Sequence, residues 1–182
     1  RRRHTRFRNV TGVQTCALPI YILELSQTPF NKINIHVGGT YGDKANALQT
    51  WCSNFALLPD NVKSRLTVEN DDKKNNYNVK DLMFIHNTVG IPIVFDYHHH
   101  KFNTGDLTEQ EAFNLAHSTW SNIVPAFHVS EPRDTSNPRA HHDFILTKVN
   151  TYGKTVDLML ECKQKDIALL KYRELHEMNV EV

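Results

Sequence analysis

Short apolar runs alternate with longer amphipathic stretches from residue 31 onward, in units of roughly 30 residues, the size of a strand–helix–strand repeat. The runs lie at residues 33–38, 65–70, 91–97, 124–130 and 156–162. They are nearly continuous in apolar residues, as is typical of parallel strands that are buried on both faces. The pattern therefore predicts five parallel strands.

The stretches between these runs repeat their apolar residues at steps of three and four, which predicts helices. We expect them at residues 45–58, 79–88, 108–123, 140–152 and 166–177. The third begins with TEQE, in which Thr108 can cap the helix while Glu111 reaches back to the cap. The fourth is followed by Gly153, a residue that commonly ends a helix.

Five strand–helix units in a row indicate an α/β fold with right-handed parallel crossovers. The first strand is followed by GGTYGDK, which is neither a dinucleotide fingerprint nor a Walker loop, so a Rossmann fold is disfavoured. We predict a partial TIM (β/α)₈ barrel instead. Because a complete barrel needs about 250 residues, the five units are expected to be the last five of eight, with the N-terminal units missing.

The first twenty residues are treated separately because VTGVQTCALPI, at residues 10–20, looks like a translated sequencing adaptor. We therefore divide the chain into a non-native segment at 1–20 and a truncated barrel domain at 21–182. A basic arm for nucleic acid is the alternative interpretation. Residues 1–20 hold five arginines and no acids, so the rest has 21 − 5 = 16 basic against 20 acidic residues, a net charge of −4. Overall charge therefore gives no support to nucleic-acid binding.

Composition excludes several classes of protein. With 40% hydrophobic and 23% charged residues, the 182-residue chain is neither disordered nor fibrous. It has no run of about 20 apolar residues, so we predict no membrane helix. Its three cysteines form no CxxC pair, which argues against a disulfide framework or a zinc knuckle and favours a reducing, intracellular setting.

Each predicted strand ends near a carboxylate or an imidazole. These residues are His36, Glu69, Asp96 with His99 three positions on, His128 and Glu161. The carboxyl ends of barrel strands meet on one face, where active sites lie. Nitrogen and oxygen donors suit Mn²⁺, Zn²⁺, Fe²⁺ or Mg²⁺.

Taken singly, each of these residues has an ordinary explanation. A lone histidine on a strand is more often a satisfied core residue than a ligand, and Glu69, followed by Asn70, Asp71 and Asp72, could belong to an acidic turn. Five strand ends out of five are hard to reach by chance, and buried ionisable groups must be paired or metal-bound. The sequence therefore predicts a polynuclear metal site.

Such a site suits phosphodiester hydrolysis, because one ion makes hydroxide while the others stabilise charge on the phosphate. The loops after the strands carry basic residues that could hold a DNA backbone, although each taken alone could equally be solvated surface. These are Lys73, Lys74, Lys101, Arg133, Arg139, Lys163 and Lys165.

Six motifs resemble the UV damage endonuclease family, in the family's order. They are HVGGTYGDK (36–44), RLTVENDDK (65–73), PIVFDYHHH (92–100), FHVSEPR (127–133), RAHHDFI (139–145) and MLECKQKDIALL (159–170). The resemblance covers residues 31–177. It implies a TIM barrel related to endonuclease IV and a Mn²⁺-dependent enzyme that nicks DNA 5′ to UV photoproducts and some other lesions.

The resemblance also implies roles for particular residues. The metal ligands would be His36, Glu69, Asp96, His99, His128 and Glu161, with Glu69 bridging. Glu69, Glu161 and His128 would be catalytic, and Arg133, Arg139, His141 and Lys163 would contact DNA. We expect two or three divalent ions, Mn²⁺ first and Zn²⁺ or Mg²⁺ as alternatives. The implied partner is damaged double-stranded DNA, bound by a protein that is a monomer when full length. The implied location is a bacterial cytoplasm or a eukaryotic nucleus.

The chain departs from the family in two respects. Ala126 stands where the family usually has a lysine, whose carbamate ligates metal. We also expect the family's first strands, with their histidines and lesion-probing loop, to be missing. We therefore expect the 182-residue chain alone to bind fewer ions than a full-length relative and to leave irradiated DNA intact. The alternatives are a metal-dependent barrel of the sugar isomerase, epimerase or AP-endonuclease type, and a metal-poor fragment without activity.

Overall fold

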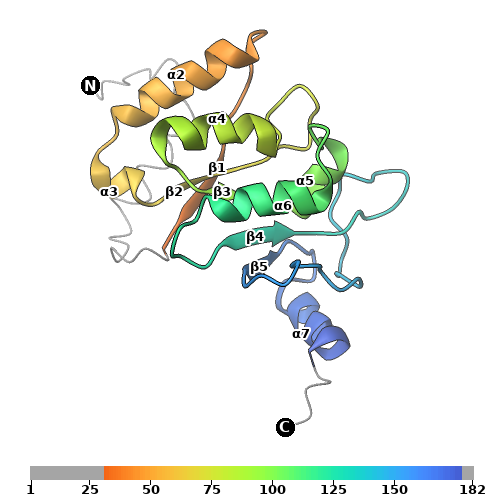
Figure 1. Cartoon of the computed structure of the whole chain (residues 1–182). Coiled ribbons are helices and arrows are strands. Elements are labelled where there is room, and N and C mark those ends of the chain that lie inside the picture. Colours follow the sequence, from red (N-terminus) through yellow and green to blue (C-terminus); the bar gives the residue numbers. More distant parts are fainter. Residues whose placement is uncertain (1–30, 178–182) are drawn as a thin grey trace, which may run out of the picture.

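Five parallel strands form the frame of the chain within residues 31–177, the part that the computed structural model describes (Figure 1). They are β1 (Ile33–His36), β2 (Leu66–Glu69), β3 (Ile93–Val94), β4 (Ala126–Val129) and β5 (Asp157–Leu160). One sheet has the order β1-β2-β3 and the other pairs β4 with β5, all in parallel. The prediction of a parallel α/β fold is confirmed.

Within the described residues the two sheets meet between β3 and β4. Asp96 and His128 form an isolated parallel bridge there, and the His128 N–H donates to the Phe95 carbonyl over 3.0 Å. The strands thus follow one another in chain order, so their carboxyl ends face the same way. Within the described residues the strands do not close into a barrel.

Helices connect the strands and cover them. They are α2 (Lys44–Ala56), α3 (Asp60–Lys63), α4 (Val79–Val89), α5 (Tyr97–Phe102), α6 (Glu109–Ser118) and α7 (Lys165–His176). Helix α4 packs between α2 and α6 and contacts β2 and β3 (Figure 1). The predicted cap of α6 is confirmed, because the Glu111 N–H donates to the Thr108 hydroxyl and the Thr108 N–H donates to the Glu111 carboxylate. Within the described residues no helix is both long and apolar enough to cross a membrane.

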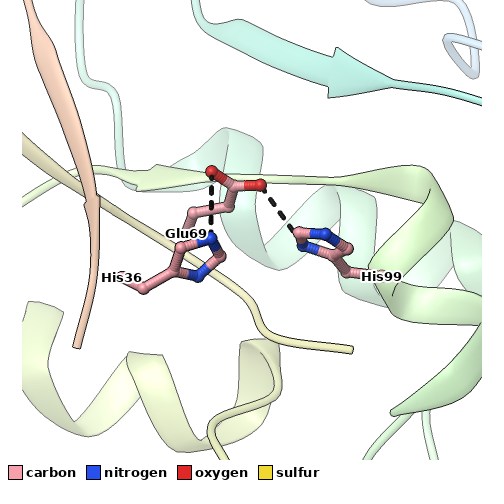
Figure 2. A group of neighbouring side chains, drawn as sticks. All are labelled: His36, Glu69 and His99. Carbon is pink, nitrogen blue, oxygen red and sulfur yellow. Dashed lines mark ion pairs between the residues drawn. The ribbon is translucent and has the colours of Figure 1, made fainter. Parts of the chain in front are cut away.

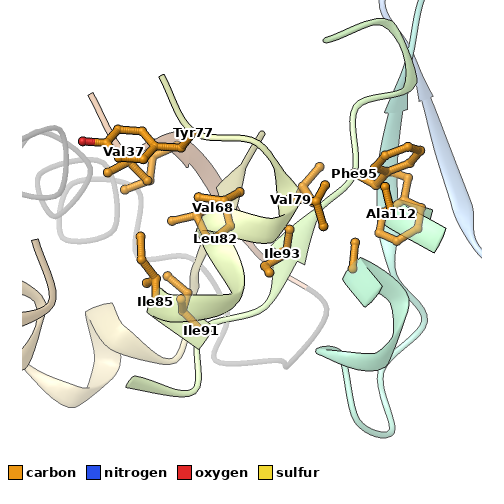
Figure 3. Packing of buried hydrophobic residues seen from close by; sticks show 14 of the residues in the cluster. Val37, Val68, Tyr77, Val79, Leu82, Ile85, Ile91, Ile93, Phe95 and Ala112 are labelled. Carbon is orange, nitrogen blue, oxygen red and sulfur yellow. The ribbon is translucent and has the colours of Figure 1, made fainter. Parts of the chain in front are cut away.

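The core lies between the strands and the helices that cover them (Figure 3). Val68 of β2 and Ile93 of β3 pack with Leu82 and Ile85 of α4, and all four side chains are fully buried. Neighbouring strand positions alternate between this core and the opposite face, since successive side chains of a strand point to opposite sides. Thr67 and Glu69 of β2 therefore point away from α4, to the face where the polar groups gather.

The helix predicted at 140–152 is wrong, because that segment is irregular. The Glu131 carboxylate accepts hydrogen bonds from the N–H groups of Leu146 and Thr147, at 3.1 and 2.8 Å. Such side-chain acceptors satisfy backbone donors outside a helix and so compete with helix formation. Gly153 has a φ of 73° and lies in a turn, where it ends no helix.

Helix α5 was not predicted, because its first residue, Tyr97, belongs to the apolar run at 91–97 that predicts a strand. Asp96 caps it by accepting the His99 N–H over 2.8 Å, so the chain turns from strand to helix at a polar residue. Helix α3 was missed as well. The prediction that residues 1–20 are non-native lies outside the described residues.

Candidate metal centre

The predicted strand-end residues come together at one edge of the sheets. His36 and Glu69 are the last residues of β1 and β2 and stand opposite each other in register. Asp96 follows β3 and is bridged to His128 of β4, and Glu161 follows β5. We call the set of His36, Glu69, Asp96, His99, His128 and Glu161 the strand-end cluster. The prediction that these residues lie together is consistent with the geometry, because parallel strands deliver their carboxyl ends to one edge.

Glu69 lies at the centre of the cluster and is almost fully buried, with 4% of its surface exposed. Its Oε1 lies 3.3 Å from His99 Nδ1, and its Oε2 lies 3.4 Å from His128 Nδ1 and 3.9 Å from His36 Nε2. Figure 2 shows the Glu69 carboxylate between the rings of His36 and His99. One carboxylate thus contacts three imidazoles from three different elements.

Asn70 holds both Asp96 and His99 in place. Asp96 donates its N–H to the Asn70 side chain over 2.8 Å, and the Asn70 amide donates to the Asp96 carbonyl over 3.1 Å. His99 Nδ1 lies 2.8 Å from the Asn70 carbonyl. Such contacts orient a metal-ligating imidazole and fix which nitrogen carries the proton.

On the other side, His128 Nδ1 lies 3.0 Å from Glu161 Oε1. The second oxygen of Glu161 lies 3.7 Å from Nδ1 of His141, whose segment pairs back to the loop after β4 through an isolated bridge with Pro132. His141 therefore adjoins the strand-end cluster. This residue was predicted to contact DNA, and its position does not test that role.

The charges in the cluster shift one another's pKa. Burial opposes the charged form of His99, but its contacts with Glu69 and the charge of Asp96 raise its pKa to about 9. Burial also opposes the charged form of His128, but its contacts with Glu161 and Glu69 raise its pKa to about 10. Burial, together with the charge of Glu69, raises the pKa of Asp96 to about 7. Despite its own burial, Glu69 has a pKa far below its usual range because His128 and His99 stabilise its charge.

The residues of the cluster fit a divalent ion. Donor atoms of His36, Glu69 and His99 lie within 4.8 Å of one another, and so do those of Glu69, Asp96 and His128. Asp96 Oδ2 is buried and makes no hydrogen bond to the described residues, so it has a lone pair to offer. Imidazole nitrogens and carboxylate oxygens together suit ions such as Mn²⁺ and Zn²⁺. Glu69 belongs to both groups and is the donor that could bridge two ions.

Several supporting residues escaped sequence analysis. The Asn34 amide donates to Glu69 Oε2, and the Thr67 hydroxyl lies 3.1 Å from Asn34 Oδ1, so a short chain of hydrogen bonds holds the central carboxylate. Asp71 Oδ1 lies 3.3 Å from His36 Nδ1, and this contact raises the pKa of His36. Asn34 lies two positions before His36, and the period of two along β1 could have revealed it.

Arg133, Arg139 and Lys163, which are predicted to contact DNA, are exposed in the loops after β4 and β5. Arg139 is exposed and pairs with Asp72 over 2.9 Å, and Arg133 pairs with its neighbour Asp134 over 2.7 Å. Lys163 is exposed two residues after Glu161. Ala126 lies on β4 two positions before His128, and its methyl side chain supplies no metal ligand.

Parallel strands that deliver imidazoles and carboxylates to one edge give an α/β protein with a candidate metal site at its strand ends. The chain belongs to the UV-endonuclease UvdE family, whose model matches residues 7–181. The expected resemblance is thereby confirmed, and the family is one of nucleases.

Individual relatives agree with this assignment. The chain is 39% identical over 157 residues to the UV DNA damage endonuclease of Bacillus cereus (strain Q1), a match covering 81% of this chain and 48% of that protein. The corresponding enzyme of Bacillus thuringiensis subsp. konkukian (strain 97-27) is 39% identical over 150 residues, covering 77% and 47%. The crystal structure of SacUVDE matches with a TM-score of 0.77 at 31% identity, over 89% of this chain and 56% of that chain. The chain thus spans about half the length of the curated relatives it matches.

Proposed function

We propose that this chain carries the metal centre and part of the DNA-binding face of an endonuclease that nicks damaged duplex DNA 5′ to UV photoproducts. The observation that carries the proposal is the position of Glu69, one buried carboxylate in contact with three histidines. The family membership and the names of the relatives supply the reaction class. The proposed fold is part of a TIM barrel, in which the five parallel strands are consecutive strands of the barrel.

Two or three divalent ions would be held by the strand-end cluster. His36, Glu69 and His99 would hold one, and Glu69 would share a second with Asp96 and His128. Mn²⁺ is the proposed ion, and Zn²⁺ or Mg²⁺ would suit the same donors. When bound, such ions supply a hydroxide nucleophile at neutral pH and stabilise charge on the attacked phosphate and the leaving oxygen.

The protein's own groups would orient these donors. Glu161 holds the His128 ring through its Nδ1 atom, and Asn70 does the same for His99 through its backbone carbonyl. Asn34 fixes one oxygen of Glu69. Glu69, Glu161 and His128 are therefore the residues to which we assign catalytic roles, because they adjoin one another where the phosphate would be attacked.

The substrate would be held by groups around the cluster. Arg133, Arg139 and Lys163 are exposed beside the strand ends, and His141 adjoins Glu161. Cationic side chains in such positions bind phosphates and fix the register of a duplex without reading its sequence. We propose that the protein acts as a monomer on DNA, in the cytoplasm of a bacterium or the nucleus of a eukaryote.

The test is a nicking assay on UV-irradiated supercoiled plasmid, with an unirradiated plasmid as the control. A version of the protein that also carries the parts of the Bacillus cereus relative outside the matched region is expected to convert only the irradiated plasmid to the open circle in Mn²⁺ and to lose this activity in a chelator. Activity that survives thorough chelation would contradict the metal-dependent mechanism. Equal nicking of both plasmids would contradict damage recognition.

A further inference from the structure

Among the residues that the structure describes, a groove lined by cationic and amide side chains lies between the loop after β2 and the loop after β4. Its lining residues are Lys73, Lys74, Asn75, Asn76 and Arg139, and its volume is about 460 Å³. We propose that this Lys73–Asn76/Arg139 groove binds the phosphodiester backbone of DNA beside the metal centre. The inference rests on the proposed function and deepens it, because it assigns a second point at which the substrate is held.

One wall of the groove is held rigidly. The buried side chain of Asn103, the C-cap of α5, donates to the carbonyls of Asp71 and Lys73 at 3.1 and 2.9 Å. The Asn76 N–H donates to the Lys73 carbonyl over 2.8 Å, so the loop closes on itself. A pinned loop loses little conformational freedom when it binds a ligand, which favours affinity.

The opposite wall is Arg139, whose position is also fixed. Its Nε pairs with Asp72 Oδ2 over 2.9 Å, and its guanidinium lies over the ring of Phe102, 5.0 Å from the ring centre. Its carbonyl lies 3.4 Å from Nε2 of the buried His98. The guanidinium is therefore placed at the groove before any ligand arrives.

The chemistry of the lining selects an anion with several oxygens. Lys73, Lys74 and Arg139 bring three positive charges, and Asp72, which pairs with Arg139, brings one negative charge, so the net charge is +3 − 1 = +2. The amides of Asn75 and Asn76 add neutral donors. Ammonium, guanidinium and amide groups are the donors that proteins commonly direct at DNA phosphates.

Helix α5 links the groove to the metal centre. Asp96 caps its first turn and His99 lies within that turn, while Phe102 and Asn103 at its other end hold the two walls of the groove. A phosphate in the groove would thus lie at a fixed distance from the ions. This arrangement is what a nuclease needs to place one phosphodiester at its metals while a neighbouring one is anchored.

The test measures binding of a fluorescent duplex oligonucleotide to the 182-residue chain at several salt concentrations, with chelator present so that metal plays no part. The double variant Lys73→Ala/Lys74→Ala should lower the slope of log affinity against log salt by about 1.8, since each lost phosphate contact contributes about 0.9. At 0.1 M salt this corresponds to binding about 60-fold weaker. The double variant Lys73→Arg/Lys74→Arg should keep the wild-type slope.

The matched control is Lys63→Ala/Lys154→Ala, which removes the same charge just before β2 and β5, at the amino ends of the strands. This control should keep the wild-type slope. If the wild type binds DNA and the two alanine variants have equal slopes, the assignment of the groove as a DNA-binding site is wrong, while the proposed function still stands. If the wild type binds no duplex at low salt, both the DNA-binding role of the groove and the proposed function are wrong. Displacement of the duplex by millimolar inorganic phosphate at constant ionic strength would indicate a site for the free ion and would overturn the backbone assignment.

Discussion

Replacing Glu69 with glutamine removes the negative charge at the centre of the strand-end cluster while nearly preserving the shape of the side chain. An amide is a poor metal ligand, and it cannot neutralise the two ions that a carboxylate would bridge. We therefore expect Glu69→Gln to lose most of the metal bound by the wild type and, under the proposed function, most of the nicking rate, while the fold persists.

The same substitution has a measurable effect on stability without metal. The pKa of His99 is raised from 6.5 to about 9 and that of His128 from 6.5 to about 10, in each case partly by Glu69. Removing one partner of a buried charge pair costs about 3 kcal/mol, because the charges that remain lose their compensation. Because both pKa values are raised in the folded state, this stabilisation is fully present below pH 6.5 and is lost as the pH rises through 9 to 10.

The assay is urea unfolding of the metal-free proteins at pH 6 and pH 10. Glu69→Gln should lower the free energy of unfolding by about 3 kcal/mol at pH 6, and the loss should shrink at pH 10, where His99 is mostly deprotonated and His128 about half deprotonated. The exposed Glu174→Gln on α7 is the matched control and should change neither value. A pH-independent difference, or metal binding equal to that of the wild type, would refute the central role of Glu69.

Three further predictions concern the same cluster. Asn34→Ala and Thr67→Val should each weaken the metal affinity measured by calorimetry, because the Thr67 hydroxyl and the Asn34 amide together orient Glu69. Thr67→Ser should preserve the affinity. Unchanged affinity in both Asn34→Ala and Thr67→Val would contradict this role. Metal binding at pH 8 should release protons from His99 and His128, so affinity should rise with pH and the binding heat should depend on the buffer's ionisation enthalpy; buffer-independent heats would contradict the raised pKa values. Ala126→Lys, which restores the residue common in the family, should raise the metal content per chain in elemental analysis, and unchanged content would show that this position contributes no ligand.

Strand positions and strand-end residues were predictable because both depend on local patterns. A buried parallel strand needs a continuous apolar run, so the sequence around Val68 and Ile93 marked β2 and β3, and the polar residue that ends each run marked the edge. The Thr108 cap was predictable for the same reason, since both partners lie within one turn.

What sequence analysis missed depends on contacts between distant residues. The segment 140–152 has helical spacing, but Glu131 satisfies its backbone from outside, and no local pattern reveals that acceptor. The hydrogen bonds from Asn103 to the loop after β2 join residues about thirty positions apart, so they form only once the chain is folded. Asparagine is common in loops, so its role here had no signal in the sequence.

The central claim is that the strand-end cluster binds more than one divalent ion through a shared Glu69. Anomalous diffraction at the manganese edge, from crystals of this chain grown with Mn²⁺, tests it most directly. We expect one peak among His36, Glu69 and His99 and a second among Glu69, Asp96 and His128, with Glu69 contacting both. Manganese peaks only at other surfaces, or a cluster whose side chains contact no ion at saturating Mn²⁺, would contradict it.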